Sequence, residues 1–381
     1  MSEMFGNSQL QHHSTAKWRR GAALRHGYTT AACAAAAGAA AAKALLEGEV
    51  QETITIDLPG EKQVTFHLAT CAMSNSSITC GVIKDAGDDP DVTHGAEIRA
   101  TVGWGGTPGI TIAGGEGVGI VTRPGLPVPV GEAAINPGAR RLIAATVSHV
   151  VGEMLSERGL VITISVPEGQ TIAEKTLNPR LGIIGGISIL GADGIVKPYS
   201  VAAYRATIRL ALRVARRNGI AKVVLATGSR SERHARGRYP GLAGMAFVQV
   251  GDHVDCALKQ TVRLHFQEVV IATMVGKASK LAQGQMQTHV SEGPVDLAAL
   301  AEVASEIGAD EALQAAVRAA NTVHHAQKLL RAAAISGLEQ RLAQLAAEQA
   351  AAFVGGAVPV EVLIYSLDGA LLGLAQVGSR A

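Results

Sequence analysis

The sequence predicts a mixed fold: an N-terminal, mostly antiparallel α+β domain followed by a C-terminal, doubly wound parallel α/β domain. In the first half, short segments rich in β-branched residues follow one another closely, separated by turns that contain proline or glycine. In the second half, short apolar segments alternate with longer helical segments, which is typical of a parallel sheet covered on both faces. A chain of 381 residues, 48% of them apolar, is long enough for two such cores.

The first domain is expected over residues 25–198, after a flexible arm at 1–24. Thr29-Thr30 is a typical helix cap, and the alanine-rich helix after it should run to about Leu46. A second helix is expected over 136–158, because an Asn-Pro pair opens it. The expected strands are 53–57, 63–68, 79–84, 97–102, 109–112 and 160–166.

The second domain is expected over residues 199–381, after a glycine-rich connector at 178–198. A helix should run from Tyr199 to about Asn218, and further helices should fill 295–352. Apolar strands are expected at 222–227, 268–274 and 360–365, the last of which should end the fold. This alternation is typical of a Rossmann-like domain.

Composition excludes several classes of function. Aromatic residues make up only 3% of the chain and the net charge is +2, so we expect no nucleic-acid partner. No stretch reaches 18 uninterrupted apolar residues, so we expect no membrane span. The alanine-rich stretch near the N-terminus lacks the leucine-rich character of an export signal, and we expect a cytoplasmic protein. The sequence is compatible with a homo-oligomer and does not give the oligomeric state.

Four cysteines are present, and no two of them have C-x-x-C spacing. We therefore expect free thiols that pack as small apolar side chains in a reducing compartment, with no metal bound by the protein. The cysteines are Cys33, Cys71, Cys80 and Cys256.

An acidic loop at residues 84–95 is the most distinctive segment. Four carboxylates lie within seven residues, at Asp85, Asp88, Asp89 and Asp91, and a glycine and a proline interrupt them. Aspartates favour turns, which is the simpler explanation. Because clustered carboxylates repel one another, the loop is also expected to bind a partner: a cation, backbone N–H groups, a sugar diol or a cationic ligand. The ligand spacing of a calcium-binding loop is absent.

Several common nucleotide and hydrolase motifs are missing. The glycine-rich segment 114–119 does not match G-x-G-x-x-G, and the segment around Lys277 does not match a Walker A loop. H-E-x-x-H and G-x-S-x-G do not occur. These absences argue against a dehydrogenase, an NTPase, a zincin and a serine hydrolase. Gly114, Gly115 and Gly117 either allow close approach to a ligand or form a bulged hairpin turn.

Candidate binding residues follow the expected strands of the second domain, where open α/β sheets bind ligands. Thr227 and Gly228 follow one strand, and Lys277, Lys280 and His289 follow another. A loop after the first of these strands is expected to carry four arginines, which either grip carboxylates or face water. They are Arg230, Arg233, Arg236 and Arg238. A further set at helical spacing is expected to form one exposed face: Arg205, Arg209, Arg213, Arg216 and Arg217.

Several blocks in order resemble the cobalt-precorrin-5B C1-methyltransferase family of anaerobic cobalamin biosynthesis, over about residues 25–330. The acidic string K-D-A-G-D-D-P-D-V-T-H-G resembles the signature of that family. The other matching blocks are G-Y-T-T at 27–30, 114–119, T-R-P-G-L at 122–126, 131–137, N-P-R-L-G-I at 178–183, 186–191, and 276–289. The sequence departs from the pattern at Ala31, Ala192-Asp193 and Tyr199.

The resemblance implies methyl transfer from S-adenosylmethionine to C1 of cobalt-precorrin-5B, giving cobalt-precorrin-6A. Cobalt would arrive only as part of the tetrapyrrole substrate, which carries many carboxylate arms. Since C1 becomes quaternary, the attacking carbon loses no proton, and catalysis is expected to be mostly alignment. The implied substrate-binding residues are Arg123, Arg180, Arg230, Arg233, Lys277 and Lys280.

Further roles follow from the same resemblance. Asp91, Gly114, Gly115, Gly117, Thr227 and Gly228 are the candidates for binding the methyl donor. Asp85, Asp88, Asp89 and His289 are the catalytic candidates, with His289 or an aspartate as any general base. Two alternatives remain open: a phosphate-transferring enzyme and a non-catalytic tetrapyrrole carrier. The sequence does not tell which domain binds the donor, or whether the substrate contains cobalt.

Overall fold

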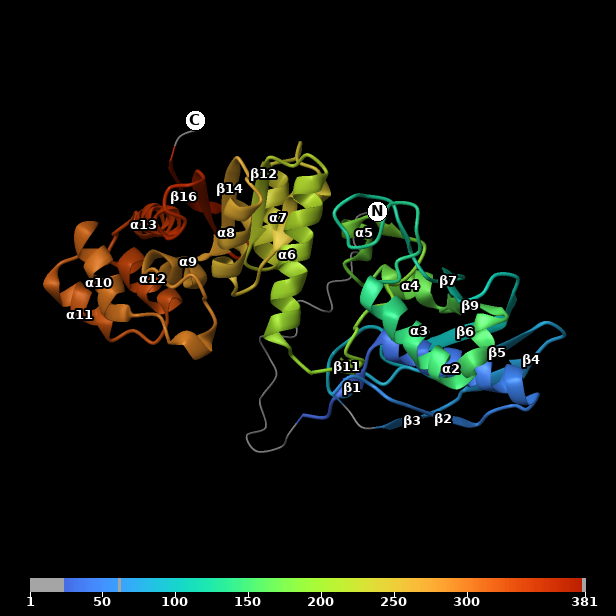
Figure 1. Ribbon diagram of the computed structural model, residues 1–381. Coiled ribbons are helices and arrows are strands. Elements are labelled where there is room, and N and C mark those ends of the chain that lie inside the picture. Colours follow the sequence, from blue (N-terminus) through green and yellow to red (C-terminus); the bar gives the residue numbers. More distant parts are fainter. Residues whose placement is uncertain (1–23, 61–62, 379–381) are drawn as a thin grey trace. The chain divides into compact units, whose positions relative to one another are not determined.

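The computed structural model describes residues 24–60 and 63–378, which fall into two compact units that meet between Ser200 and Val201 (Figure 1). The arm expected at 1–24 lies outside the described residues except for Leu24. None of the described helices is long and apolar enough to cross a membrane.

A five-stranded sheet forms the core of the first unit, in the order β4-β5-β6-β9-β7. Neighbouring strands are antiparallel except β7 and β9, which are parallel, so the prediction of a mostly antiparallel domain is confirmed. The strands are β4 (Thr70–Met73), β5 (Ser77–Ile83), β6 (Glu97–Gly105), β7 (Ile110–Gly114) and β9 (Gly159–Ser165).

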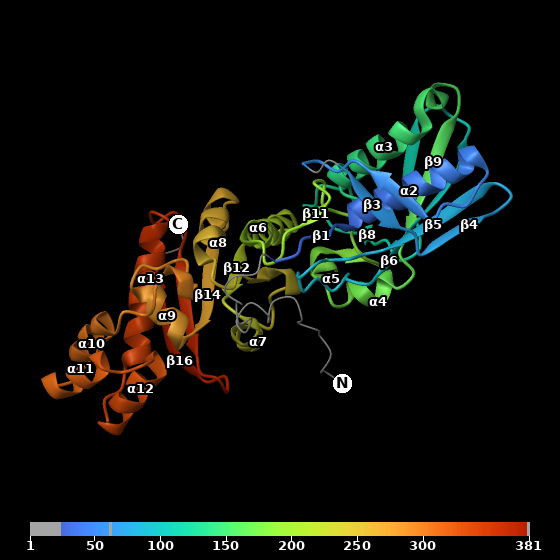
Figure 2. The ribbon, with the colours of Figure 1, turned by 90° about the horizontal axis from the view of Figure 1, so that it is seen from below.

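Helices α2 (Thr30–Glu47) and α3 (Pro137–Val151) pack against each other on one face of this sheet (Figure 2). Thr29 Oγ1 accepts a hydrogen bond from the Ala32 N–H at 3.2 Å and so caps α2. The alanines of α2 from Ala31 to Ala44 are buried, and their small side chains let the helix lie close to the sheet.

The second expected helix was predicted too long. It ends at Val151, because Gly152 takes a φ of 64°, and the 3-10 turn η2 (Gly152–Ser156) follows it.

Smaller elements complete the first unit. Three strand pairs lie outside the main sheet: β2 (Thr53–Ile56) with β3 (Val64–His67), β1 (Gly27–Tyr28) with β11 (Ile195–Val196), and β8 (Ile120–Val121) with β10 (Ile183–Ile184). Two short helices are α4 (Gly169–Ala173) and α5 (Asn178–Leu181).

The sheet of the second unit has the order β13-β12-β14-β15-β16 and is parallel except for its last strand. The prediction of a doubly wound parallel domain is confirmed. The strands are β12 (Lys222–Ala226), β13 (Phe247–Gln249), β14 (Glu268–Met274), β15 (Val360–Tyr365) and β16 (Leu371–Val377). The expectation that 360–365 ends the fold was wrong, because β16 pairs antiparallel with β15.

Helices cover both faces of this sheet (Figure 2). Helix α7 (Ser229–Arg238) packs on one face with Val224, Val270 and Leu363. The other face is covered by α6 (Val201–Arg217), α8 (Val254–Arg263), α9 (Val275–Ala282) and α13 (Leu338–Phe353). The remaining elements are η3 (Gly244–Ala246), η4 (Val290–Glu292), α10 (Leu297–Glu306), α11 (Glu311–Arg318) and α12 (Val323–Ala332).

The connections that follow β12 and β14 run over opposite faces of the sheet. From β12 the chain passes through α7 to β13, whereas from β14 it passes through α9 and the later helices to β15. Such a reversal between neighbouring strands is a topological switch point, and open α/β sheets bind ligands at its carboxyl end.

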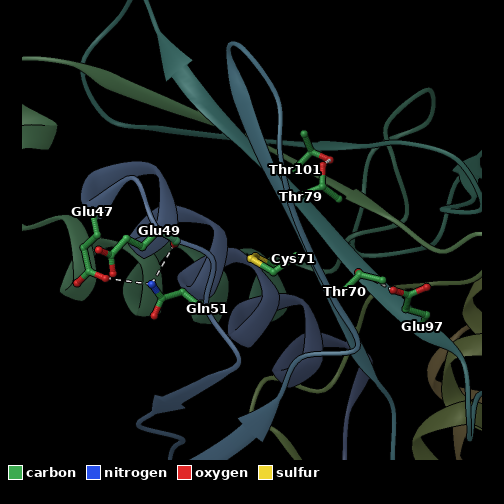
Figure 3. Close-up of a disulfide and its surroundings, with 9 residues drawn as sticks. Glu47, Glu49, Gln51, Thr70, Cys71, Thr79, Glu97 and Thr101 are labelled. Atoms are coloured by element: carbon green, nitrogen blue, oxygen red, sulfur yellow. Dashed lines mark hydrogen bonds between the residues drawn. A yellow bond between two sulfur atoms is a disulfide. The ribbon is translucent and has the colours of Figure 1, made fainter.

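One cysteine expectation was wrong. Cys71 and Cys80 stand directly opposite each other on β4 and β5 and form a disulfide (Figure 3). The pairing could not be read from spacing alone, because it depends on the register of the two strands. Cys33 and Cys256 are free thiols, as expected.

Candidate functional site

The first two aspartates of the acidic loop are bound by Arg25. The guanidinium of Arg25 contacts both carboxylate oxygens of Asp85, one of them at 2.9 Å. The Arg25 N–H donates to Asp88 Oδ2 at 2.6 Å. Arg25, together with the backbone N–H of Gly87, lowers the pKa of Asp85 to about 2. Both aspartates therefore hold the chain that leads into β1.

Close backbone approach makes this arrangement possible. A side chain at Gly27 would overlap the backbone of Ala86, and one at Gly87 would overlap the carbonyl oxygen of Arg25. Gly87 also has a φ of 66°, a left-handed backbone conformation that favours glycine.

Asp91 forms an ion pair with a buried lysine. Its Oδ2 lies 2.7 Å from Lys84 Nζ, and the Lys84 side chain is only 1% exposed. Its Oδ1 accepts hydrogen bonds from the N–H and the hydroxyl of Thr93. Burial alone would raise the pKa of Asp91, but the charge of Lys84 and these hydrogen bonds outweigh it and lower the pKa. Both oxygens of Asp91 are thus used inside the loop.

Asp89 reaches the end of the first unit. Its Oδ1 accepts a hydrogen bond from the N–H of Tyr199 at 2.9 Å, and Tyr199 has a φ of 56°. All four aspartates of the loop therefore bind groups of their own unit. Their expected roles in catalysis and donor binding stay predictions.

The glycine-rich segment after β7 packs against other parts of the chain. A side chain at Gly117 would overlap the carbonyl oxygen of Val166, and one at Gly115 would press on Thr163. One at Gly114 would meet Ala133. The need for glycine here has a steric reason that requires no ligand, and donor binding by these residues stays a prediction.

Arg123 and Arg180 come from neighbouring segments of the first unit. Thr122 donates from its N–H and its hydroxyl to the carbonyl oxygen of Gly182, each at 2.7 Å. The stem of Arg123 lies over Gly182, where a side chain would overlap it. Arg123 is exposed and Arg180 is half-buried. These two predicted substrate-binding residues are therefore brought to one place.

Thr227 and Gly228 lie at the carboxyl end of β12, at the switch point. The Thr227 side chain is buried and donates to Thr273 Oγ1 at 2.9 Å, so its backbone faces the edge. Gly228 is extended and precedes the first turn of α7, and no atom lies within 4 Å of the place where its Cβ would be. This is the least crowded glycine among the donor-binding candidates.

The four arginines after β12 lie on helix α7, not in the expected loop. Arg236 pairs with Glu232 one turn earlier, with Nη2 2.6 Å from Oε1. Arg230, Arg233 and Arg238 are exposed. Arg230 and Arg233 form no ion pair within the described residues. The sequence did not reveal the helix because it has few apolar residues.

A polar cluster joins the carboxyl ends of β12, β13 and β14. Lys277, in the first turn of α9, lies 2.9 Å from Asp252 Oδ1 and donates to the carbonyl oxygen of Thr227 at 3.0 Å. Thr288 Oγ1 donates to the same Asp252 oxygen at 2.8 Å. Sequence reasoning missed Asp252, although an aspartate about 20 residues beyond a strand-end glycine was a usable signal.

Lys280 and His289 have structural contacts. The buried Nζ of Lys280 donates to the carbonyl oxygens of Thr288, His289 and Gly293, at 3.0, 3.2 and 2.7 Å. All three of its N–H groups are thereby used within the fold, and its expected role in binding substrate stays a prediction. His289 Nδ1 accepts from the Ser291 N–H at 3.1 Å, so its neutral ring carries hydrogen on Nε2.

The expected arginine face on α6 is only partly exposed. Arg209 and Arg217 are exposed, but Arg205 is half-buried, with Nη2 2.5 Å from Asp255 Oδ2 and 3.0 Å from Gln287 Oε1. Its Nε–H also donates to His253 Nδ1 at 3.4 Å. Burial, reinforced by Arg205, lowers the pKa of His253. The face therefore belongs partly to the same polar edge.

Residues 24–60 and 63–378 contain no group of three or more histidine, cysteine, aspartate or glutamate side chains placed to hold a metal ion.

Two family models match the chain: CbiD over residues 17–198, and the CbiD C-terminal domain over residues 287–376. Several curated relatives carry the name cobalt-precorrin-5B C(1)-methyltransferase. The protein from Geobacillus kaustophilus (strain HTA426) is 51% identical over 92% of this chain and 95% of its own length. Those from Priestia megaterium and Salinispora tropica are each 46% identical over 92% of this chain, and over 96% and 92% of their own lengths.

One solved structure also matches, the crystal structure of a cobalamin biosynthesis protein (cbiD) from Archaeoglobus fulgidus. It is 29% identical and covers 71% of this chain and 83% of its own, with a TM-score of 0.38.

Proposed function

The chain belongs to the CbiD family, and on that basis we propose that it methylates C1 of cobalt-precorrin-5B, with S-adenosylmethionine as the methyl donor, in cobalamin biosynthesis. The observation that carries this proposal is 51% identity over 92% of the chain to a protein named for this reaction. Cobalt enters as part of the substrate. The product would be cobalt-precorrin-6A.

Arg230 and Arg233 are well suited to bind the acidic arms of the substrate. They lie in the first half of α7, one turn apart, exposed and without an ion pair in the described part of the chain. Cations near a helix N-terminus oppose the helix dipole and cost roughly 0.3–1 kcal/mol each. Because neither arginine has an ion-pair partner among residues 24–60 and 63–378, binding of carboxylates is a better reason for these arginines than helix stability. Bidentate pairing would also orient the macrocycle.

Arg123 and Arg180 offer a second set of cationic groups, on the first unit. Their segments are joined by the two hydrogen bonds from Thr122 to Gly182 and lie next to the paired strands β8 and β10. Lys277 has a weaker claim to direct substrate binding, because its ammonium group is already engaged by Asp252 and Thr227.

The methyl donor is proposed to bind at the carboxyl ends of β12 and β14, next to Thr227 and Gly228. The open space beside Gly228 and the switch-point position support this site. The N-terminus of α7 also presents backbone N–H groups, which suit the carboxylate of the amino-acid part of the donor.

The proposed chemistry needs little from a general base at the attacking carbon. C1 becomes quaternary, so its bond to the methyl group forms as the methyl–sulfur bond breaks, and no proton leaves C1. Alignment of carbon, methyl and sulfur is then the main task of the protein. A general base of the protein would act on a proton elsewhere on the macrocycle. The Nδ1 contact of His289 leaves its neutral ring with an Nε2–H donor. We therefore assign His289 a hydrogen-bonding role.

The proposal is tested by calorimetric titration of S-adenosylhomocysteine with and without the cobalt-precorrin, followed by a methyl-transfer assay. Binding of the product nucleoside together with turnover supports a methyltransferase. Macrocycle binding without nucleoside binding or turnover indicates a tetrapyrrole carrier. A thermal shift with ATP–Mg²⁺ and none with S-adenosylhomocysteine indicates a phosphate-transferring enzyme.

A further inference from the structure

Asp252 occupies a defined place at the proposed donor edge. Residues after β13 still follow β12, because the Val250 N–H donates to the Ala226 carbonyl oxygen at 2.9 Å. Asp252 comes two residues later, and Lys277 holds it to the carbonyl of Thr227. The carboxylate therefore lies beside the end of β12, in the turn that follows the adjacent strand β13.

One carboxylate oxygen of Asp252 is hydrogen-bonded and the other is available to a ligand. Oδ1 receives both Lys277 Nζ and the Thr288 hydroxyl, at 2.9 and 2.8 Å. Oδ2 accepts no hydrogen bond from the described residues, and the side chain is 24% exposed. Burial alone would raise the pKa of Asp252, but Lys277 outweighs it, with help from Thr288, and lowers the pKa. Asp252 is thus an ionised, oriented acceptor at an open edge.

An oriented carboxylate in this position suits a vicinal diol. In nucleotide-binding α/β folds, an acidic residue about 20 positions beyond the first strand-end glycine accepts hydrogen bonds from ribose hydroxyls. Gly228 and Asp252 stand in that relation, and they follow the two adjacent strands β12 and β13. Lys277 also has its charge offset by Asp252, so a cationic sulfonium is not repelled by a free ammonium group.

From this geometry we propose that Asp252 binds the ribose hydroxyls of the methyl donor, with Lys277 and Thr288 as positioning residues. The inference rests on the proposed function, because it takes S-adenosylmethionine as the donor. It assigns the donor nucleoside to residues 201–378 and names the group that selects a ribose.

The first test compares two ligands on the unmodified protein. S-adenosylhomocysteine should bind roughly 10- to 100-fold more tightly than its 2′,3′-dideoxy analogue, as expected for hydrogen bonds to a charged group. Because no substitution is made, failure to fold cannot obscure the result. Equal affinities for the two ligands would overturn the role of Asp252 and leave the proposed methyl transfer intact. Failure of both ligands to bind, with and without the macrocycle, would overturn the proposed function as well.

The second test uses Asp252→Asn and Asp252→Ala. Both should bind S-adenosylhomocysteine roughly 10- to 100-fold more weakly, and Asp252→Ala should lose most of the preference for the ribose form. Asp310→Asn is the matched control: it removes one charge in the same unit at a helix cap, where asparagine is equally suitable. It should leave affinity and preference unchanged. If Asp252→Ala keeps its fold and the full preference, the proposal is wrong.

Discussion

At the scale of single residues, the pair Lys84–Asp91 is the clearest structural interaction of the acidic loop. The lysine is 1% exposed, and its Nζ lies 2.7 Å from the carboxylate. Removing one member of a buried pair leaves the other charged and unpaired in the interior. The contacts of Asp91 give it this structural role, and its expected role in binding the donor stays a prediction.

Asp91→Ala is expected to lower the free energy of unfolding by about 3–5 kcal/mol. Urea-induced unfolding measures the change, and Asp57→Ala, at an exposed position of the same unit, serves as control. A loss below about 1 kcal/mol, the value for an exposed pair, would contradict the buried-pair account.

The pH dependence provides a second readout of this pair. The pKa of Asp91 is lower in the folded protein than in the unfolded chain, where it is about 3.9. The stabilisation is therefore complete above the unfolded pKa and is lost as the pH falls through the folded pKa. Melting temperatures of the unmodified protein should drop on acidification below about pH 4, and Asp91→Asn should drop less steeply.

A substitution at Asp89 can distinguish a structural role of the acidic loop from a catalytic role. Asp89→Asn keeps an acceptor oxygen for the Tyr199 N–H, so thermal stability should change little. If the loop serves catalysis, turnover should fall at least about tenfold, which corresponds to about 1.4 kcal/mol in the barrier. Comparable small losses in both properties would leave the loop with a structural role alone.

At the scale of elements, strands with a strong local sequence pattern were predicted well, and short or isolated strands were not. The expected strands at 268–274 and 360–365 coincide with β14 and β15, because buried apolar runs are distinctive. Strand β13 has only three residues, and β16 is mostly not fully buried and contains a glycine and a glutamine, so neither was recognised. Asp252 was missed for a related reason: its spacing from Gly228 becomes informative only once β13 is identified as the strand next to β12.

The packing of α2 gives a prediction at this scale. Ala36→Leu introduces three further carbon atoms at a position with no exposed surface, in a helix that packs on both α3 and the sheet. Overpacking should cost about 1–3 kcal/mol of stability. Ala298→Leu, the same change at an exposed position of α10, is the control and should be near neutral. Chemical denaturation of both variants checks the difference.

At the scale of the whole molecule, two separately folded units each carry part of the expected chemistry. The sequence predicted the two fold types because each half has its own rhythm of strands and helices. It predicted the polar edge of the second sheet less well. Only the structure showed that Lys280 ties down a loop, that α7 is a helix, and that Arg205 joins the edge.

Arg233→Ala is expected to weaken binding of the macrocycle roughly two- to fivefold, as for an exposed ion pair, and to make the remaining binding less dependent on salt. Arg217→Ala, which removes an exposed arginine at the far end of α6, is the matched control. Affinity measured at two ionic strengths checks both effects. Equal affinities and equal salt dependence for the two variants would indicate that Arg233 faces water and does not bind the macrocycle.

The state of the four cysteines allows a dye to be attached selectively to one thiol. Cys71 and Cys80 are joined, and the Cys33 thiol is fully buried, which raises its pKa to about 12. Cys256, half-buried on α8, is the remaining thiol. A maleimide dye added to the native protein should therefore attach at one position, two residues from Val254 and four from Asp252. Fluorescence from that single dye would report events at the donor edge in the unmodified sequence.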